Sequence, residues 1–248
     1  MTKAPENLAA RIDHTLLRAD ATGEDIDRLC YEAKRFHFAA VCVNPTWVAR
    51  CAERLKDSGV LVCAVVGFPL GAHLPEVKAL EAKRAVADGA AEVDMVADLG
   101  ALKSGHDARY DRDIRAVVSE VGPAVTVKVV LETARLRRDE IVRAAEIVKA
   151  AGAKFVKTST GFAGEATVDD VRLLRETVGS AMGIKASGGI RTRAEALALI
   201  EAGATRIGTS SGVAIVSGGE PASVDRPAGE VLEPHPLTLP ASRAGGRS

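Results

Sequence analysis

Four ionisable residues lie inside segments that are otherwise apolar, and they carry the clearest chemical signal in the chain. Asp94 lies in Glu-Val-Asp-Met-Val, Lys128 in Thr-Val-Lys-Val-Val, Lys157 in Lys-Phe-Val-Lys-Thr and Lys185 in Gly-Ile-Lys-Ala-Ser. Lysine and aspartate are rarely buried unless they are paired, so each position needs an explanation. A strand end that emerges into solvent, or a structural ion pair, would explain one of them. Three lysines and an aspartate that are all predicted to face one opening favour an active site.

Lys157 and Lys185 belong to consecutive candidate strands, and their proximity would activate one of the two amines. Neighbouring strands lie about 4.8 Å apart, so the ammonium groups can approach to about 6 Å. At that separation and an effective dielectric constant of about 20, two positive charges repel by about 2.8 kcal/mol, which lowers one lysine pKa from about 10.4 toward about 8. The free amine can attack a carbonyl group and form a Schiff base. Asp94 would supply a carboxylate for proton transfer at the same opening.

Glycine-rich segments follow the last two candidate strands and indicate a phosphate site. They are Ala-Ser-Gly-Gly-Ile-Arg at 186–191 and Gly-Thr-Ser-Ser-Gly at 208–212, and the second opens a short predicted helix. Glycine amides, hydroxyl groups and a helix N-terminus bind anions together, and the loops after barrel strands seven and eight are a recurrent phosphate site. Ordinary turn glycines are the alternative. Because two such segments occur at these two positions, we favour phosphate.

The elements that must position these residues are short β-branched segments that alternate with longer helical ones. Strands are predicted over 11–14, 39–43, 60–66, 92–96, 125–131, 154–158, 183–186 and 206–209. Helices are predicted over 75–88, 139–151 and 192–202, with Pro75 in a first turn, a capping box at Thr192 and Glu195, and Gly89, Gly152 and Gly203 as stop signals. Strand midpoints are spaced by roughly 22 to 34 residues, which is the period of a strand plus a crossover helix and predicts parallel strands.

Eight such units predict an α/β fold, a (β/α)8 TIM barrel that forms a single domain over residues 1–216. A doubly wound open sheet is the competing architecture, but it usually has fewer strands and a glycine fingerprint, and Gly-x-Gly-x-x-Gly does not occur here. Residues 217–248 hold five of the ten prolines and show no periodic pattern. This composition predicts a flexible tail.

Composition excludes several classes of protein. The 248 residues include 33 Lys and Arg and 33 Asp and Glu, so no net charge attracts nucleic acid, and aromatic residues are only 3%. No apolar segment is long enough to predict a signal peptide or a membrane span. Cys30, Cys42, Cys51 and Cys63 lack the spacing of a metal site, so we expect free thiols and a reducing cytoplasm. Zero net charge also predicts that the positive charge at the opening is balanced elsewhere.

The chain resembles a known family, the deoxyribose-phosphate aldolases (DeoC/DERA), over roughly residues 12–217. The matching strings are Ile-Asp-His-Thr-Leu-Leu at 12–17, Val-Cys-Val-Asn-Pro at 41–45, Gly-Phe-Pro-Leu-Gly at 67–71, Glu-Val-Asp-Met-Val at 92–96, Lys-Thr-Ser-Thr-Gly-Phe at 157–162, Ile-Lys-Ala-Ser-Gly-Gly-Ile-Arg-Thr at 184–192 and Ile-Gly-Thr-Ser-Ser-Gly at 207–212. The resemblance implies that Lys157 forms the imine, Lys185 perturbs it and transfers protons, and Asp94 is the acid and base. It also implies that Asp13 and Lys128 orient these three groups. For phosphate it implies a cradle made of Gly161, Gly188, Gly189, Gly208, Ser210 and Ser211, whereas ordinary packing is the expected role of Cys42.

Three departures from the family pattern stand out. Ala97-Asp98 replaces an aliphatic residue and asparagine of many relatives, which would alter packing or charge beside Asp94. The segment 161–166 is less glycine-rich than usual, and its Glu165 would be an awkward neighbour for phosphate. No tyrosine follows Tyr110, so a C-terminal tyrosine cannot assist proton transfer.

The resemblance and the lysine pair predict a class I lyase that reversibly cleaves 2-deoxy-D-ribose 5-phosphate to acetaldehyde and D-glyceraldehyde 3-phosphate. Such a reaction belongs to deoxyribose phosphate catabolism. A phosphosugar isomerase that uses Asp94 as its base, and a non-catalytic phosphosugar-binding barrel, are the alternatives. We expect no metal or other cofactor, because an iminium ion replaces a Lewis acid. Phosphosugars and aldehydes are the expected partners, with no nucleic acid or membrane partner, and we expect a homodimer or higher homo-oligomer.

Overall fold

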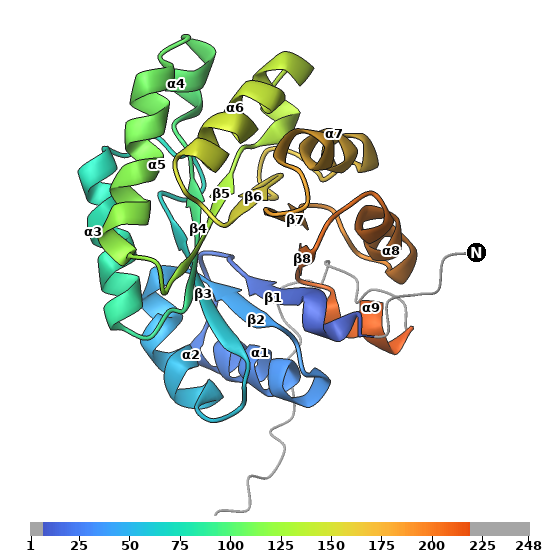
Figure 1. Cartoon of the computed structure of the whole chain (residues 1–248). Helices are drawn as coiled ribbons and strands as arrows, with labels where there is room; N and C mark the ends of the chain where they lie inside the picture. Colours follow the sequence, from blue (N-terminus) through green and yellow to red (C-terminus); the bar gives the residue numbers. More distant parts are fainter. Residues whose placement is uncertain (1–6, 219–248) are drawn as a thin grey trace, which may run out of the picture.

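The computed structural model describes residues 7–218 and shows a closed barrel of parallel strands in sequence order, β1 to β8 (Figure 1). The strands are β1 Ile12–Leu16, β2 Ala40–Val43, β3 Leu61–Val66, β4 Glu92–Val96, β5 Thr126–Val130, β6 Phe155–Lys157, β7 Gly183–Ser187 and β8 Arg206–Thr209. The barrel closes because β8 pairs with β1 as well as with β7. The predicted TIM barrel is therefore confirmed, and the strand ends agree with the sequence prediction to within two residues.

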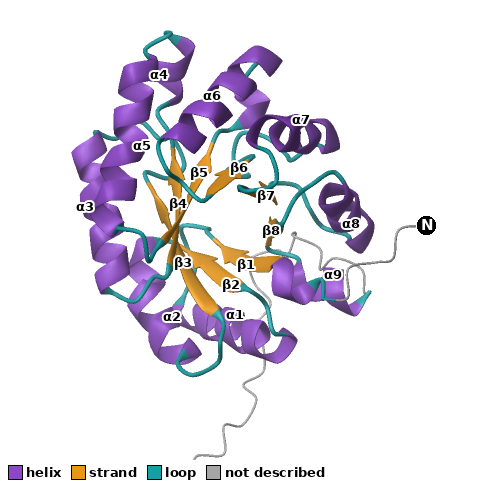
Figure 2. Ribbon diagram, viewed as in Figure 1, coloured by secondary structure: helices purple, strands orange, loops and turns teal. Residues whose placement is uncertain are grey.

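Helices form the outer ring around the strands (Figure 2). They are α1 Gly23–Phe36, α2 Val48–Leu55, α3 Pro75–Ala87, α4 Leu99–Lys103, α5 Asp107–Val121, α6 Arg138–Ala150, α7 Val168–Val178, α8 Arg193–Glu201 and α9 Gly212–Ser217. The three helices predicted from the sequence are present, and Thr192 makes the expected capping box with Glu195 at the start of α8. The part of the predicted tail beyond residue 218 lies outside the described residues.

The two faces of the strands bury different kinds of side chain. Outward-facing residues such as Val41, Val93 and Ile184 pack against the helices in one large apolar core. A small cluster of Ala40, Cys42, Cys63 and Val65 fills part of the barrel on β2 and β3. Because side chains alternate between the faces of a strand, charged residues two apart, such as Glu92 and Asp94, share the interior face.

Strand register brings the ionisable residues together. Lys157 on β6 pairs with Lys185 on β7, and Asp94 on β4 pairs with Lys128 on β5. Lys185 is also paired with Arg206 on β8. Among the described residues, no helix is long and apolar enough to cross a membrane.

Candidate active site

The carboxylate of Asp94 is the centre of the site and binds three lysines. Its Oδ2 atom accepts hydrogen bonds from Lys157 Nζ at 2.8 Å and from Lys185 Nζ at 2.7 Å. Its Oδ1 atom accepts from Lys128 Nζ at 3.0 Å. All four side chains are almost completely buried. The structure thus brings together the lysines and the aspartate that the sequence singled out.

Two further carboxylates and an arginine extend this cluster. Asp13 on β1 pairs with Lys185 and, at 2.6 Å, with Arg206. Glu92 accepts from Lys128 at 2.6 Å and from Arg206 at 3.2 Å. The predicted concentration of positive charge is therefore largely compensated at the site itself. Glu92 and Arg206 were not predicted, although Glu92 stands two residues before Asp94 on the same strand.

Counting the charges of the cluster identifies which proton it can lose. Its cations are Lys128, Lys157, Lys185 and Arg206, and its carboxylates are Asp13, Glu92 and Asp94. With every group ionised the cluster carries one positive charge, and it becomes neutral when one ammonium loses its proton. Among the described residues, Lys157 pairs with a single carboxylate, whereas Lys185 and Lys128 each pair with two or more. Lys157 therefore has the fewest carboxylate partners of the three lysines in the cluster.

The pKa shifts of its neighbours support this assignment. Burial disfavours the ammonium of Lys185, but the charges of Asp13 and Asp94 outweigh it and raise the pKa of Lys185 well above its ordinary value. Burial likewise disfavours the Asp94 carboxylate, yet Lys128, Lys157 and Lys185 hold its pKa well below its ordinary value. Lys185 thus remains a cation beside Lys157. The sequence argument named Asp13 and Asp94 but counted only the repulsion between the lysines, and it left out the attraction of these two carboxylates that keeps Lys185 protonated.

Two buried thiols complete the environment of Asp94. Cys63 on β3 donates to Oδ1 of Asp94 at 3.1 Å, and Cys42 on β2 lies 3.9 Å from Oδ2. Burial is the main cause that raises the pKa of Cys63, so this group remains a thiol donor. The two sulfurs and Asp94 have the spacing of metal ligands, but Lys128 Nζ is already 3.4 Å from the Cys63 sulfur. An ammonium takes the place that a cation would need. All four cysteines are free and buried, as expected.

The loops after β5, β6 and β7 are tied together beside Lys157. Thr158 Oγ1 donates to the Ser187 carbonyl at 3.1 Å, and Ser187 Oγ donates to the Ser159 carbonyl at 2.6 Å. Thr160 Oγ1 donates to the buried carboxylate of Glu132 at 2.5 Å. Glu132 was not predicted, because it follows β5 in a loop that shows no motif. This network fixes the backbone that carries the imine-forming candidate.

The glycine-rich loops predicted to bind phosphate lie next to one another. A Cβ atom on Gly161 would be 3.8 Å from the Cα atom of Gly188, and Thr209 Oγ1 donates to the Ile190 carbonyl at 2.6 Å. Gly188 and Gly189 both have positive φ values, and among the described residues their amides have no acceptor. Gly208, Ser210 and Ser211 lie at the end of β8 and the start of α9. The structure gathers these residues at one side of the opening, and phosphate binding there stays a prediction.

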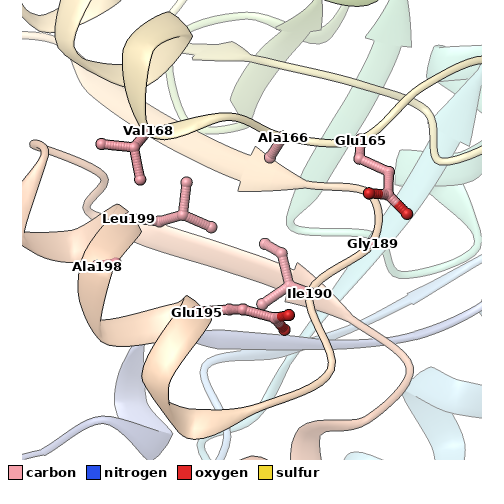
Figure 3. A pocket seen from close by; sticks show the side chains of 9 residues that line it. Glu165, Ala166, Val168, Gly189, Ile190, Glu195, Ala198 and Leu199 are labelled. Atoms are coloured by element: carbon pink, nitrogen blue, oxygen red, sulfur yellow. The ribbon is translucent and has the colours of Figure 1, made fainter.

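The departures found in the sequence have different consequences. Asp98 caps α4 by accepting from the Ala101 amide at 3.0 Å, and it pairs with Arg109 at 2.8 Å. The charge of Asp98 is therefore compensated by Arg109 and by the amide at the start of α4. Glu165, in contrast, lies against the Gly189 loop (Figure 3).

A buried lysine beside a carboxylate and a second ammonium, at the C-terminal opening of a (β/α)8 barrel, defines an aldolase of the imine-forming class. The family model of the DeoC/LacD family aldolases matches residues 8–218. The chain belongs to this family.

Curated relatives and solved structures agree with that assignment. The chain is 59% identical over 213 residues to a deoxyribose-phosphate aldolase of Geobacillus sp. (strain WCH70), covering 86% of this chain and 96% of the relative. It is 55% identical over 219 residues to that of Listeria innocua, covering 88% and 98%. Among solved structures, the tetrameric deoxyribose phosphate aldolase from Aeropyrum pernix aligns with a TM-score of 0.79 and 35% identity, over 85% of this chain and 89% of that one.

Proposed function

We propose that this aldolase reversibly cleaves 2-deoxy-D-ribose 5-phosphate to acetaldehyde and D-glyceraldehyde 3-phosphate through a Schiff base on Lys157. One observation carries the proposal: Lys157 and Lys185 donate to the same oxygen of Asp94, at 2.8 Å and 2.7 Å. This arrangement gives an amine, a proton donor and a proton acceptor within one contact of each other. Family membership supports aldol cleavage rather than the isomerase or the non-catalytic binding barrel.

The first half of the reaction forms the iminium ion. The neutral amine of Lys157 attacks the C1 aldehyde of the open-chain sugar and gives a carbinolamine. Asp94, which contacts both lysines, relays the protons that let the hydroxyl group leave as water. Lys185 is a cation when the cycle begins. It gives up a proton through Asp94 or a water molecule to the departing hydroxyl group, and it takes a proton back from solvent before the next turnover.

The second half breaks the carbon–carbon bond. A base removes the proton of the C3 hydroxyl, the C2–C3 electron pair moves into the iminium, and D-glyceraldehyde 3-phosphate leaves. The enamine that remains on Lys157 is protonated at C2, and water hydrolyses the resulting iminium to acetaldehyde and the free amine. Binding of the remote phosphate by the loops at Gly188 and Gly208 would hold C1 close to Lys157.

Reductive trapping tests the nucleophile. Sodium borohydride added with acetaldehyde should reduce the imine and leave an ethyl group on Lys157, which peptide mass mapping locates. Lys154 is an internal control, because this exposed lysine is only three residues away and donates to the Pro123 carbonyl. Ethylation of Lys154 with Lys157 unmodified, or full cleavage activity in Lys157→Leu, would show that the nucleophile lies elsewhere.

We also infer that the chain forms a homo-oligomer and works in a reducing cytoplasm. The Aeropyrum pernix relative is described as tetrameric. On this chain, Leu74, Val77 and Leu80 are exposed at the start and along one side of α3, where a second copy would cover them. Four free thiols support a reducing compartment.

A further inference from the structure

Glu165 lies against the loop of Gly188 and Gly189, two of the glycines of the proposed phosphate cradle. A Cβ atom on Gly189 would come within 2.5 Å of the Glu165 Cδ atom and 2.7 Å of its Oε1 atom, so this side chain fills the space beside the glycine. The backbone holds it there, because the next amide, that of Ala166, donates to the Gly188 carbonyl at 3.0 Å. In Figure 3 the carboxylate points at the Gly189 loop.

The charge of Glu165 has no partner within residues 7–218, where its carboxylate makes no hydrogen bond or ion pair. A second glutamate, Glu195, lines the same cavity of about 180 Å³, but it accepts hydrogen bonds from the amides of Arg191 and Thr192 at 2.8 Å and 2.9 Å. The uncompensated negative charge beside the two glycine amides therefore belongs to Glu165. A phosphate dianion bound to this loop would meet that charge.

We propose that Glu165 is a specificity-determining residue, which weakens binding of a terminal phosphate and so opens the site to neutral substrates such as unphosphorylated 2-deoxyribose. This inference rests on the proposed function. A hydroxyl group in place of the phosphate carries no charge, and it can donate a hydrogen bond to the carboxylate. The preference for the phosphorylated sugar over the unphosphorylated one is then smaller than it would be at a cradle of glycine amides without Glu165.

The size of the effect follows from electrostatics. A carboxylate and a dianion about 6 Å apart in surroundings close to water repel enough to change affinity about tenfold. Glu165→Gln keeps the shape of the side chain and should lower the KM for 2-deoxyribose 5-phosphate about tenfold, with kcat little changed. The KM for unphosphorylated 2-deoxyribose should stay the same or rise. Glu165→Lys should extend the trend, and salt near 1 M should reduce the difference between the variants.

Glu53→Gln is the matched control, because it removes the same exposed charge from α2, on the other side of the barrel from α8 (Figure 1). It should alter neither KM. A structural role of Glu165 would change kcat/KM for both sugars in parallel. Such a parallel change, or an unchanged ratio of the two kcat/KM values, would overturn the proposal.

Inorganic phosphate separates this inference from the proposed reaction. Calorimetric titration of the full chain should show phosphate bound about tenfold more tightly by Glu165→Gln than by the wild type. If neither sugar is cleaved but phosphate still distinguishes the two proteins, the reaction is wrong and the role of Glu165 stands. Equal phosphate affinities would refute the role of Glu165 whatever the reaction is.

Discussion

Replacing Lys185 by methionine tests whether its charge is what keeps Lys157 reactive. Both Nζ atoms bind the same Asp94 oxygen, at 2.8 Å and 2.7 Å, so they are at most about 5.5 Å apart. At that distance and an effective dielectric constant of about 20, the repulsion is about 3 kcal/mol, which corresponds to about two pH units. Without Lys185 the cluster has as many cations as carboxylates. The repulsion that favours loss of the Lys157 proton is then absent.

The assay is the pH dependence of borohydride trapping with acetaldehyde, followed by mass spectrometry of the ethylated protein. In Lys185→Met the pH at which trapping is half maximal should rise by about two units, and trapping near neutral pH should fall about a hundredfold. Lys185→Arg is the informative control, because it keeps the charge but cannot release a proton at these pH values. This variant should keep the midpoint of the wild type while its turnover falls.

An unchanged midpoint in Lys185→Met would refute the electrostatic argument. It would mean that solvent or a movement of Asp94 compensates the lost charge, and that Lys185 acts only in proton transfer. A midpoint that shifts equally in both variants would also refute it, because the charge is absent from only one of them.

Two further predictions concern stability and assembly. The lysines around Asp94 and Asp13 hold both carboxyl pKa values below the unfolded value of about 3.9, so both stabilise the fold above that pH and lose this contribution as the pH falls below it. Urea unfolding measured against pH should show this loss as a fall in the free energy of unfolding at low pH. Asp13→Asn should lower the free energy of unfolding at neutral pH by about 3–5 kcal/mol and make the fall at low pH less steep. A fall as steep as that of the wild type would be evidence against the linkage. Leu80→Glu, on the exposed side of α3, should shift the mass measured by light scattering toward the monomer, whereas Tyr31→Glu at the exposed surface of α1 should not; an unchanged mass in Leu80→Glu would place the interface elsewhere.

Much of the fold could be predicted because its signals are local. A capping box at Thr192, a proline at Pro75 and glycines after the helices mark ends that depend on a few neighbouring residues. The apolar β-branched runs are visible because parallel barrel strands are buried on both faces. The end of β1 was missed by two residues, since Thr15 and Leu16 are extended by pairing with Cys42 and Val43 of β2, which is information from outside the segment.

The site was predictable where a charge interrupts an apolar run, as at Asp94 and Lys185. Its electrostatics were not, because they depend on register across strands that are far apart in the sequence. Arg206 stands at the beginning of its strand, where an exposed arginine is common, and only closure of the barrel brings it to Asp13. Glu132 lies in a loop and itself has a positive φ value, and no pattern in the sequence predicts this backbone conformation.

The sharing of carboxylates explains how the barrel holds three buried lysines and a partly buried arginine without losing the fold. Each carboxylate of the cluster serves at least two cations, so that Asp13, Glu92 and Asp94 are shared rather than paired one to one. Burial penalises net charge, so a cluster with equal numbers of cations and carboxylates would gain nothing from the loss of a lysine proton. With one excess positive charge, the buried cluster is stabilised by the loss of one proton. The proposed imine requires that this proton leave Lys157. We therefore expect the incomplete compensation around Asp94 to be the physical basis of the proposed nucleophile.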